Sequence, residues 1–132
     1  MRIYITHCGA KKDASLKNSN KKVTPNELYK GTRIKRFMLA CMEKKVRWAV
    51  FSDLYGVWFP DTKHEWYDKA PDHVTETGFR DLVADFDRKL HGFDEIWFYY
   101  NPSRFHSMYD RLITNSSLRD RITRFTHLGQ IR

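Results

Sequence analysis

The chain has 132 residues, which fits one domain and is long enough to bury a core without covalent cross-links. Hydrophobic residues make up 41% and aromatic residues 15%, a composition that excludes a disordered chain. The formal net charge is +8, which favours an anionic partner. No apolar run approaches the roughly 20 residues of a membrane span, and residues 1–7 lack the apolar core of a signal peptide, so we expect a cytoplasmic protein without a membrane partner.

The first third of the chain contains an expected strand, a lysine-rich loop and a helix. Residues 3–6 (Ile-Tyr-Ile-Thr) predict a buried first strand. Residues 11–22 hold five lysines among asparagines and serines, which predicts a long exposed loop. The Thr-Pro-Asn-Glu sequence at 24–27 supplies an N-cap and a third-position acid, so a helix begins there. The apolar face of this helix carries Ile34, Phe37, Met38, Cys41 and Met42.

The remaining chain alternates between strands and helices. Residues 46–52 predict a second buried strand, and residues 53–72 an irregular segment rich in Trp, Tyr and Pro. Apolar residues at helical spacing between 79 and 90 predict a second helix, followed by a strand at 93–100. A third helix is expected after the Asn-Pro-Ser cap at 101–103, and a short strand at 122–127.

This order predicts one α/β domain over residues 1–132. We expect three layers, with a mainly parallel sheet of about four strands and helices on both faces. Ligands of such sheets bind beyond the carboxyl ends of the strands. That rule brings together residues 7–12, 52–61 and 100–106, which carry most of the reactive and aromatic side chains of the chain.

The first of these segments holds the candidate catalytic residues Cys8, Lys11 and Lys12. Neighbouring lysines would favour a thiolate at Cys8, and a lysine could act as nucleophile or bind a phosphate. In the competing interpretation, which we favour for Cys8, the cysteine is a small buried residue and the lysines are solvated.

The second segment holds candidate ligand-binding residues. Ser52 offers a hydrogen-bond donor and Asp53 an acceptor, Tyr55 offers a flat face for a base, and Gly56 permits close approach of the backbone. The alternative is a structural turn whose aromatic residues belong to the core. In the third segment Arg104 and His106 lie at a helix start that suits an anion, or are only surface residues.

The positive charge is concentrated in the first 47 residues. They hold 13 basic and 3 acidic side chains, a net of +10, whereas residues 48–132 hold 11 and 13, a net of −2. This asymmetry suggests DNA or RNA as a partner, although many small proteins are basic without binding either. The candidate phosphate-contacting residues are Lys17, Lys21, Lys22, Arg33 and Arg36.

Two cysteines, Cys8 and Cys41, make no disulfide framework and are typical of a reducing compartment. There is no CxxC or HxxxH pair, and the histidines show no metal-ligand spacing. We therefore expect neither a metal nor a cofactor.

Three sequence patterns together resemble a known group of proteins. They are Cys8-x-x-Lys11-Lys12, Pro25-x-x-Leu28-Tyr29-x-Gly31, and Phe51-Ser52-x-x-Tyr55-Gly56-x-x-x-Pro60-Asp61 followed by Trp66-Tyr67-Asp68. The combination resembles an uncharacterised prokaryotic domain family with a Cys-x-x-Lys-Lys start, a Leu-Tyr helix and a Ser-x-x-Tyr-Gly loop ending in Tyr-Asp. It is more distantly similar to the peroxide-stress YaaA proteins, which bind DNA, and to the amidotransferase part of archaeosine synthase, in which a lysine reacts with a deazaguanine base.

The resemblance covers roughly residues 1–70 and implies a pocket built from Cys8, Lys11, Lys12, Tyr29, Ser52, Tyr55 and Gly56. Asp68, at the end of the third pattern, is a further candidate ligand-binding residue. The resemblance favours a nucleic-acid-associated protein with a nucleobase or nucleotide pocket, with base modification as its candidate activity. Two alternatives stay open. One is a non-catalytic DNA- or RNA-binding module. The other is a small-molecule nucleoside transferase-like enzyme, in which Asp53 or Asp61 would be the nucleophile.

Overall fold

A five-stranded sheet forms the centre of the computed structural model, which describes all 132 residues. The strands lie in the order β4-β3-β1-β6-β7, and every neighbouring pair is parallel except β3 and β4. This confirms the mixed α/β architecture with a mainly parallel sheet. The strand bounds are β1 Arg2–His7, β3 Trp48–Ser52, β4 Gly56–Trp58, β6 Glu95–Tyr99 and β7 Ile122–Phe125.

The sheet has one strand more than the expected number of about four. The additional strand is β4, which lies in the segment 53–72 that we predicted to be irregular. It forms because the chain reverses at residues 53–55 and runs back antiparallel to β3, with Gly56 opposite Ser52 and Trp58 opposite Val50. A strand this short, next to a glycine and a proline, gives little sequence signal.

The helix expected after residue 24 is divided into two. α1 ends after one turn because Tyr29 is extended, with φ −83° and ψ 128°, and forms a β-bridge with Lys12. Gly31 then serves as the N-cap of the longer α2. The helix bounds are α1 Pro25–Leu28, α2 Thr32–Lys44, α3 Glu76–Leu90 and α4 Ser107–Asn115. Short 3₁₀ turns occur at Ala14–Leu16, Pro71–His73, Pro102–Arg104, Arg119–Arg121 and Leu128–Gln130.

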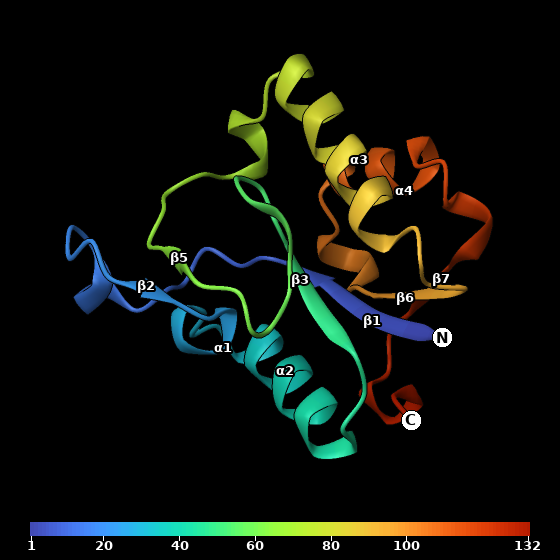
Figure 1. Cartoon of the computed structure of the whole chain (residues 1–132), viewed down its shortest axis with the longest axis horizontal. Helices are drawn as coiled ribbons and strands as arrows, with labels where there is room; N and C mark the ends of the chain where they lie inside the picture. Colours follow the sequence, from blue (N-terminus) through green and yellow to red (C-terminus); the bar gives the residue numbers. More distant parts are fainter.

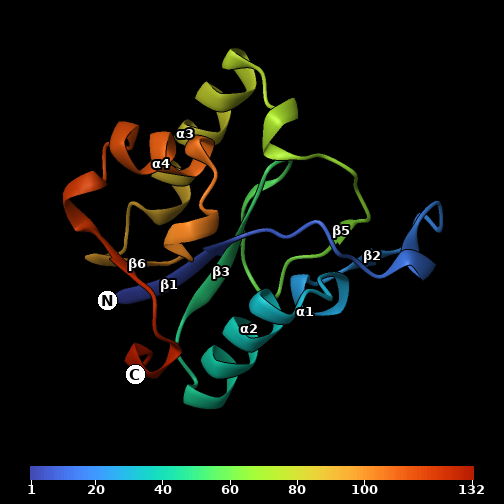
Figure 2. The ribbon, with the colours of Figure 1, turned by 180° about the vertical axis from the view of Figure 1, so that it is seen from behind.

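Two hydrophobic clusters enclose the sheet. Ile3 and Ile5 of β1 belong to the cluster that contains the buried side chains of α3 and α4, whereas Tyr4 belongs to the cluster that contains those of α2. This alternation follows from the two-residue period of a strand. Figures 1 and 2 show α2 and the pair α3 and α4 as separate groups beside β1 and β3.

A small second sheet extends from the main body. β2 (Lys22–Val23) pairs antiparallel with β5 (His64–Glu65), and we call these strands together with residues 13–21 the arm. The arm projects at the left of Figure 1. Most of residues 11–22 are exposed, as expected, but they include a 3₁₀ turn and the first residue of β2.

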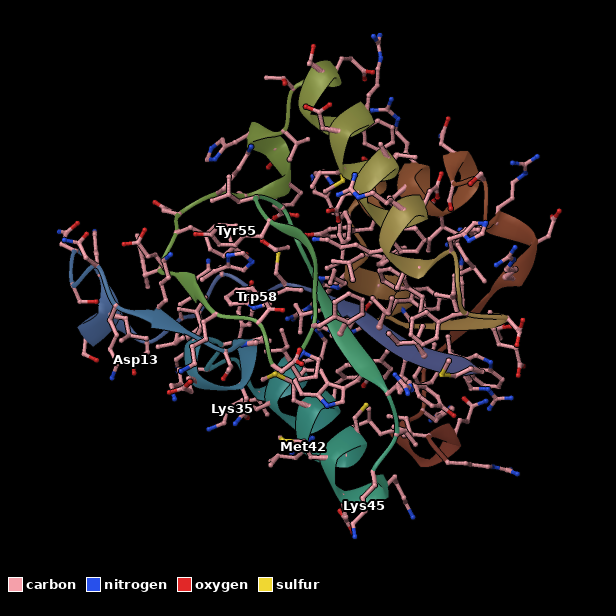
Figure 3. All side chains as sticks on the ribbon, viewed as in Figure 1. Asp13, Lys35, Met42, Lys45, Tyr55 and Trp58 are labelled. Atoms are coloured by element: carbon pink, nitrogen blue, oxygen red, sulfur yellow. The ribbon has the colours of Figure 1, made fainter.

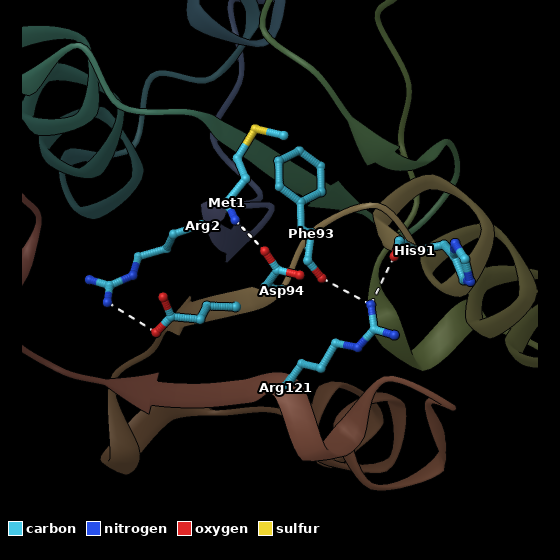
Figure 4. Close-up of polar contacts among 7 residues, drawn as sticks. Met1, Arg2, His91, Phe93, Asp94 and Arg121 are labelled. Atoms are coloured by element: carbon cyan, nitrogen blue, oxygen red, sulfur yellow. Dashed lines mark hydrogen bonds and ion pairs between the residues drawn. The ribbon is translucent and has the colours of Figure 1, made fainter.

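The amino ends of the strands are held by polar contacts. The amino group of Met1 lies 2.5 Å from Asp94 Oδ2, and Arg2 Nη2 lies 3.0 Å from Glu95 Oε1 (Figure 4). Arg121 Nη1 donates to the carbonyl oxygens of His91, at 2.8 Å, and Phe93, at 3.0 Å. These contacts join β1, β6 and the start of β7 at the amino ends of the strands.

At the carboxyl ends of the strands lies the point where the direction of strand placement across the sheet reverses. From β1 the chain passes to β3 on one side, and after α3 it returns to β6 on the other side of β1. In open α/β sheets, ligands bind beyond the carboxyl ends of the strands at such a reversal. Here that position is marked by the end of β1 at His7 and the end of β6 at Tyr99.

Candidate functional site

A pocket of about 290 Å³ lies beyond the carboxyl ends of β1 and β3, and we call it the carboxyl-edge pocket. Its lining comes from the loops after β1 and β3, from the segment before α3, and from the segment after β6 that leads into α4. The lining residues are His7, Cys8, Gly9, Ala10, Lys12, Asp53, Asp68, Lys69, Ala70, Pro71, Arg104, His106 and Tyr109. Parts of all three segments gathered by the strand-end rule therefore meet in one cavity.

The turn after β3 places Asp53 at this pocket. Ser52 is fully buried, and its Oγ accepts hydrogen bonds from the backbone N–H groups of Leu54, at 3.1 Å, and Tyr55, at 3.0 Å. Gly56 completes the reversal with φ +74°, a conformation that favours glycine. Ser52 and Gly56 thus shape the turn, and Asp53 is the residue of the turn that lines the pocket.

Asp53 is a buried carboxyl group held by a tyrosine. Its side chain is 2% exposed, and Tyr109 Oη donates to its Oδ1 at 2.7 Å. The sulfur of Cys8 lies 3.6 Å from the same hydroxyl, so the thiol donates to the tyrosine oxygen, which in turn donates to the carboxyl group. Burial raises the pKa of Asp53, and the hydrogen bond from Tyr109 opposes that rise.

Cys8 is held as a neutral thiol. Burial, together with the negative charge of Asp53, raises its pKa to about 11. The lysines that were expected to favour a thiolate do not outweigh this, and the thiol serves as a hydrogen-bond donor within the cluster. This agrees with the competing interpretation of Cys8 as a buried residue.

His7 carries the only imidazole lone pair that has no partner at this site. Its ring stacks on that of Tyr109, with centroids 4.6 Å apart and an interplanar angle of 17°. Nδ1 lies 2.8 Å from the carbonyl oxygen of Cys8, which can only accept, so Nδ1 carries the hydrogen and Nε2 the lone pair. Burial and the charge of Arg33 lower the pKa of His7 to about 4, so the ring is neutral at pH 7.

His106 lines the same pocket but has both ring nitrogens engaged. Nδ1 accepts the backbone N–H of Met108 at 3.0 Å and so caps α4, while Nε2 lies 2.7 Å from Asp72 Oδ1. Its role is therefore structural at both nitrogens. Arg104 beside it is exposed and forms no ion pair.

The two candidate lysines differ in position. Lys12 lines the pocket, is partly buried, and holds its Nζ 4.4 Å from the ring centroid of Tyr67. Lys11 is exposed and does not line the pocket, and its carbonyl oxygen accepts the backbone N–H of Lys30. Of this pair, only Lys12 is placed to reach a ligand in the pocket.

Two aromatic residues predicted to bind a ligand do not line this pocket. Tyr29 is 0% exposed, and its hydroxyl lies 2.6 Å from that of Tyr67. Tyr55 is partly buried, stacks on His64 with centroids 3.9 Å apart, and donates its hydroxyl to the carbonyl oxygen of Glu65. Figure 3 shows Tyr55 and Trp58 on the side of the sheet toward β5. Asp68, in contrast, is exposed and lines the pocket.

The basic residues of the first 47 positions are mostly free of acidic partners. No lysine or arginine from Lys11 to Arg47 takes part in an ion pair. Lys17, Lys21 and Lys22 are exposed on the arm, and Arg36 is exposed on α2, where Figure 3 shows nearby Lys35 pointing away from the sheet. Arg33 differs, because its guanidinium donates inward to Thr6 Oγ1 at 2.6 Å and to the carbonyl oxygen of His7 at 2.9 Å.

Two residues of the site were not recognised from the sequence. His7 belongs to no spacing pattern, and Tyr109 falls at an apolar position of the third expected helix. The position of His7 at a strand end was the one available signal, since side chains there point toward ligands in this type of sheet. Tyr109 gave no comparable signal, because the hydroxyl of a buried tyrosine finds its partner only in the folded chain.

Larger hollows exist elsewhere on the molecule. One of about 450 Å³ lies between the Asp53–Tyr55 turn and α3, and shares Asp53 and Lys69 with the carboxyl-edge pocket. Another, of about 640 Å³, is lined mainly by apolar residues around Trp48 and Phe93 near the amino ends of the strands. Neither combines a free imidazole, a buried carboxyl group and several cations, so the smaller pocket is the better candidate.

Comparisons with protein families, with characterised proteins and with solved structures found no match. No set of three or more His, Cys, Asp and Glu side chains is arranged to hold a metal ion. None of the helices has the length and apolar character needed to cross a membrane. The geometry of the pocket is therefore the basis for assigning a function.

Proposed function

We propose that the carboxyl-edge pocket binds a nucleobase or nucleotide, and that the protein is associated with nucleic acid. One observation carries the proposal: a buried carboxyl group, a neutral imidazole and several unpaired cations converge on one cavity at the reversal point of a parallel sheet. Perturbed titratable groups in such a cleft are typical of functional sites.

The volume limits the ligand to something small. Ligand pockets usually measure about 300–1,000 Å³, so a cavity of about 290 Å³ suits a single base or mononucleotide. In the three-layer arrangement that we propose, α2 covers one face of the sheet and α3 and α4 cover the other. The strand ends are then the natural place for a ligand.

Positive charge at the pocket supports an anionic group on the ligand. Lys12, Lys69 and Arg104 come from three different segments, and none of them forms an ion pair. A phosphate at the pocket mouth would meet charges that are not already neutralised. Asp68, the one exposed acid of the lining, would lie near the polar edge of the ligand.

If the protein is an enzyme, Lys12 is the best-placed reactive group. Lys12 lines the pocket, whereas Lys11 does not and Cys8 is held as a neutral thiol. Base modification through Lys12 remains the candidate activity. The nucleoside transferase alternative would use Asp53, which lines the pocket but whose hydrogen bond from Tyr109 reduces its nucleophilicity.

Calorimetric titration with nucleoside monophosphates, nucleosides and inorganic phosphate tests the proposal. We expect saturable binding of a monophosphate that is stronger than binding of its nucleoside. Lys12→Ala should weaken the monophosphate about tenfold, the value of one charge-assisted hydrogen bond. Lys11→Ala is the matched control and should bind as the parent protein does. Absence of binding by all three ligand classes would refute the proposal.

A second candidate function is non-catalytic binding of DNA or RNA through phosphates. It is favoured by the exposed arm lysines Lys17, Lys21 and Lys22, which have no acidic partners. Removal of each phosphate-binding lysine should lower the slope of log affinity against log salt by about 0.9 on duplex DNA. The triple alanine variant of the arm should therefore show a visibly flatter slope, whereas Arg80→Ala on α3 should not. Salt-independent binding would contradict this function.

The cellular location that we propose follows from the same chemistry. Both cysteines are free and buried, a state that suits a reducing compartment. We therefore propose the cytoplasm, where nucleotides and nucleic acids are also found.

A further inference from the structure

Two residues that line the carboxyl-edge pocket each have one side-chain polar atom without a hydrogen-bond partner in the protein. One is His7 Nε2, and the other is the second carboxyl oxygen of Asp53, since Tyr109 donates only to Oδ1. Both residues line the pocket, His7 being partly buried and Asp53 buried. They are therefore available to a ligand.

Both atoms are hydrogen-bond acceptors. The tautomer of His7 is set by its Nδ1–H, which is committed to the carbonyl oxygen of Cys8. Arg33 Nη2 can only donate, and it donates to the His7 carbonyl oxygen at 2.9 Å; its 3.4 Å distance from Nδ1 is longer than the 2.8 Å between Nδ1 and the Cys8 carbonyl oxygen, so the carbonyl sets the tautomer. A second proton on the ring would be repelled by that guanidinium. The stacking of the ring on Tyr109 fixes its plane.

We infer that His7 Nε2 is a fixed acceptor that selects ligands carrying an N–H or O–H donor, with Asp53 as the second acceptor. This selection rests on the proposed function of the pocket as a nucleobase or nucleotide site. The donor is supplied either by an exocyclic amino group of a base or by a sugar hydroxyl. The cations Lys12, Lys69 and Arg104 then hold the anionic end of the same ligand.

A role as general base is less well supported for His7. A catalytic base works best with a pKa near the operating pH, and that of His7 lies at about 4. An acceptor needs only the neutral ring, which is present throughout the physiological range. A site built to pair with a donor also rejects analogues that lack it, because its buried acceptors would be left unpaired.

Two substitutions distinguish the role of Nε2 as a hydrogen-bond acceptor from the role of the His7 ring in packing. His7→Phe keeps an aromatic ring against Tyr109 and removes both nitrogens, and His7→Gln restores an acceptor near the position of Nε2. Circular dichroism and thermal melts verify folding of both variants. Affinities are then measured by calorimetry for CMP and UMP, for AMP and IMP, and for ribose 5-phosphate.

If the donor is a base amino group, the parent protein binds CMP over UMP or AMP over IMP by about tenfold or more, and His7→Phe removes the preference. If the donor is a sugar hydroxyl, CMP and UMP bind with equal affinity, as do AMP and IMP. His7→Phe then weakens the binding of all four nucleotides and of ribose 5-phosphate to the same degree. In either case His7→Gln recovers part of the loss.

Nucleotide binding that is the same in the parent protein and in His7→Phe would overturn this inference and leave the proposed function standing. Failure of the parent protein to bind any of these ligands would overturn both. Loss of binding in both variants to the same degree, with folding intact, would show that His7 acts through its shape and would also overturn the acceptor role.

Discussion

Tyr109 joins two residues that are far apart in the sequence, because its ring stacks on His7 while its hydroxyl donates to Asp53 at 2.7 Å. One side chain of α4 therefore fixes both the imidazole plane at the end of β1 and the carboxyl group at the end of β3. The site can be rigid before a ligand arrives, which lowers the entropic cost of binding.

Removal of the Tyr109 hydroxyl should lower the free energy of unfolding, because the buried Asp53 carboxylate loses its hydrogen-bond donor. Tyr109→Phe keeps the stacking on His7 but leaves Asp53 without its donor, so we expect a loss of about 1–2 kcal/mol in the free energy of unfolding at pH 7. The loss should be smaller where Asp53 is protonated. Urea denaturation at several pH values measures it. Tyr100→Phe, whose hydroxyl makes no hydrogen bond within the protein, is the control, and equal losses in the two variants would contradict the prediction.

His7 should make the protein less stable in mild acid. Its pKa is about 4 in the folded state and near 6.5 when unfolded, so between these values the unfolded chain binds more protons. Stability should therefore fall as the pH drops from 6.5 to 4, by at most about 3–4 kcal/mol. Because the raised pKa of Asp53 acts in the opposite direction, the measurement is the difference between the parent protein and His7→Phe across this range. Parallel pH profiles of the two proteins would contradict the lowered pKa of His7.

Gly56 should tolerate no side chain. Its φ is +74°, and an added Cβ would lie 2.1 Å from Asp85 Oδ2. That carboxylate cannot move away easily, since it accepts the backbone N–H of Val57 at 2.7 Å and pairs with Lys89 at 2.8 Å. We expect Gly56→Ala to cost about 2–4 kcal/mol. Gly9→Ala meets no atom within 4 Å and should be nearly neutral in the same thermal melts, so similar melting temperatures for the two variants would argue against the strain.

The buried Tyr29–Tyr67 pair gives a test of the predicted ligand role of Tyr29. The two hydroxyls lie 2.6 Å apart, and both rings are buried. Each single change to Phe should cost about 1 kcal/mol, and the double change less than the sum, because one removal already leaves its partner unpaired. Nucleotide affinity should not change. If Tyr29→Phe instead abolished binding with stability intact, Tyr29 would be a ligand-binding residue as the sequence suggested.

Much of the architecture could be predicted because long segments carry a clear period. The strand at 3–6 and the helical spacing from Ile34 to Met42 correspond to β1 and α2. Local composition does not predict β4, a short strand that begins at a glycine and pairs with the preceding β3, or the break at Tyr29, which pairs with Lys12 beyond the lysine-rich loop. Such pairing is decided by tertiary structure, which local composition does not contain.

The site was predicted in outline by the rule that ligands lie at strand ends, and its details were not. The rule gathered the segments of Cys8, Asp53 and His106, which do line one pocket. It could not tell that Tyr29 points into the core or that the guanidinium of Arg33 turns inward to Thr6. Long amphipathic side chains can be buried or exposed with equal ease, so their direction depends on neighbours that come from elsewhere in the chain.

The neutral state of the two cysteines has a practical consequence for spectroscopy. Burial raises the pKa of Cys8 to about 11 and that of Cys41 to about 12, so neither presents a thiolate to a maleimide or iodoacetamide reagent at pH 7. A single cysteine introduced on the exposed arm, for example Ser19→Cys, would therefore react selectively with a fluorophore. Background labelling of Cys8 and Cys41 should then be low, so neither has to be replaced first. Fluorescence from the labelled arm could be used to follow its response to a ligand.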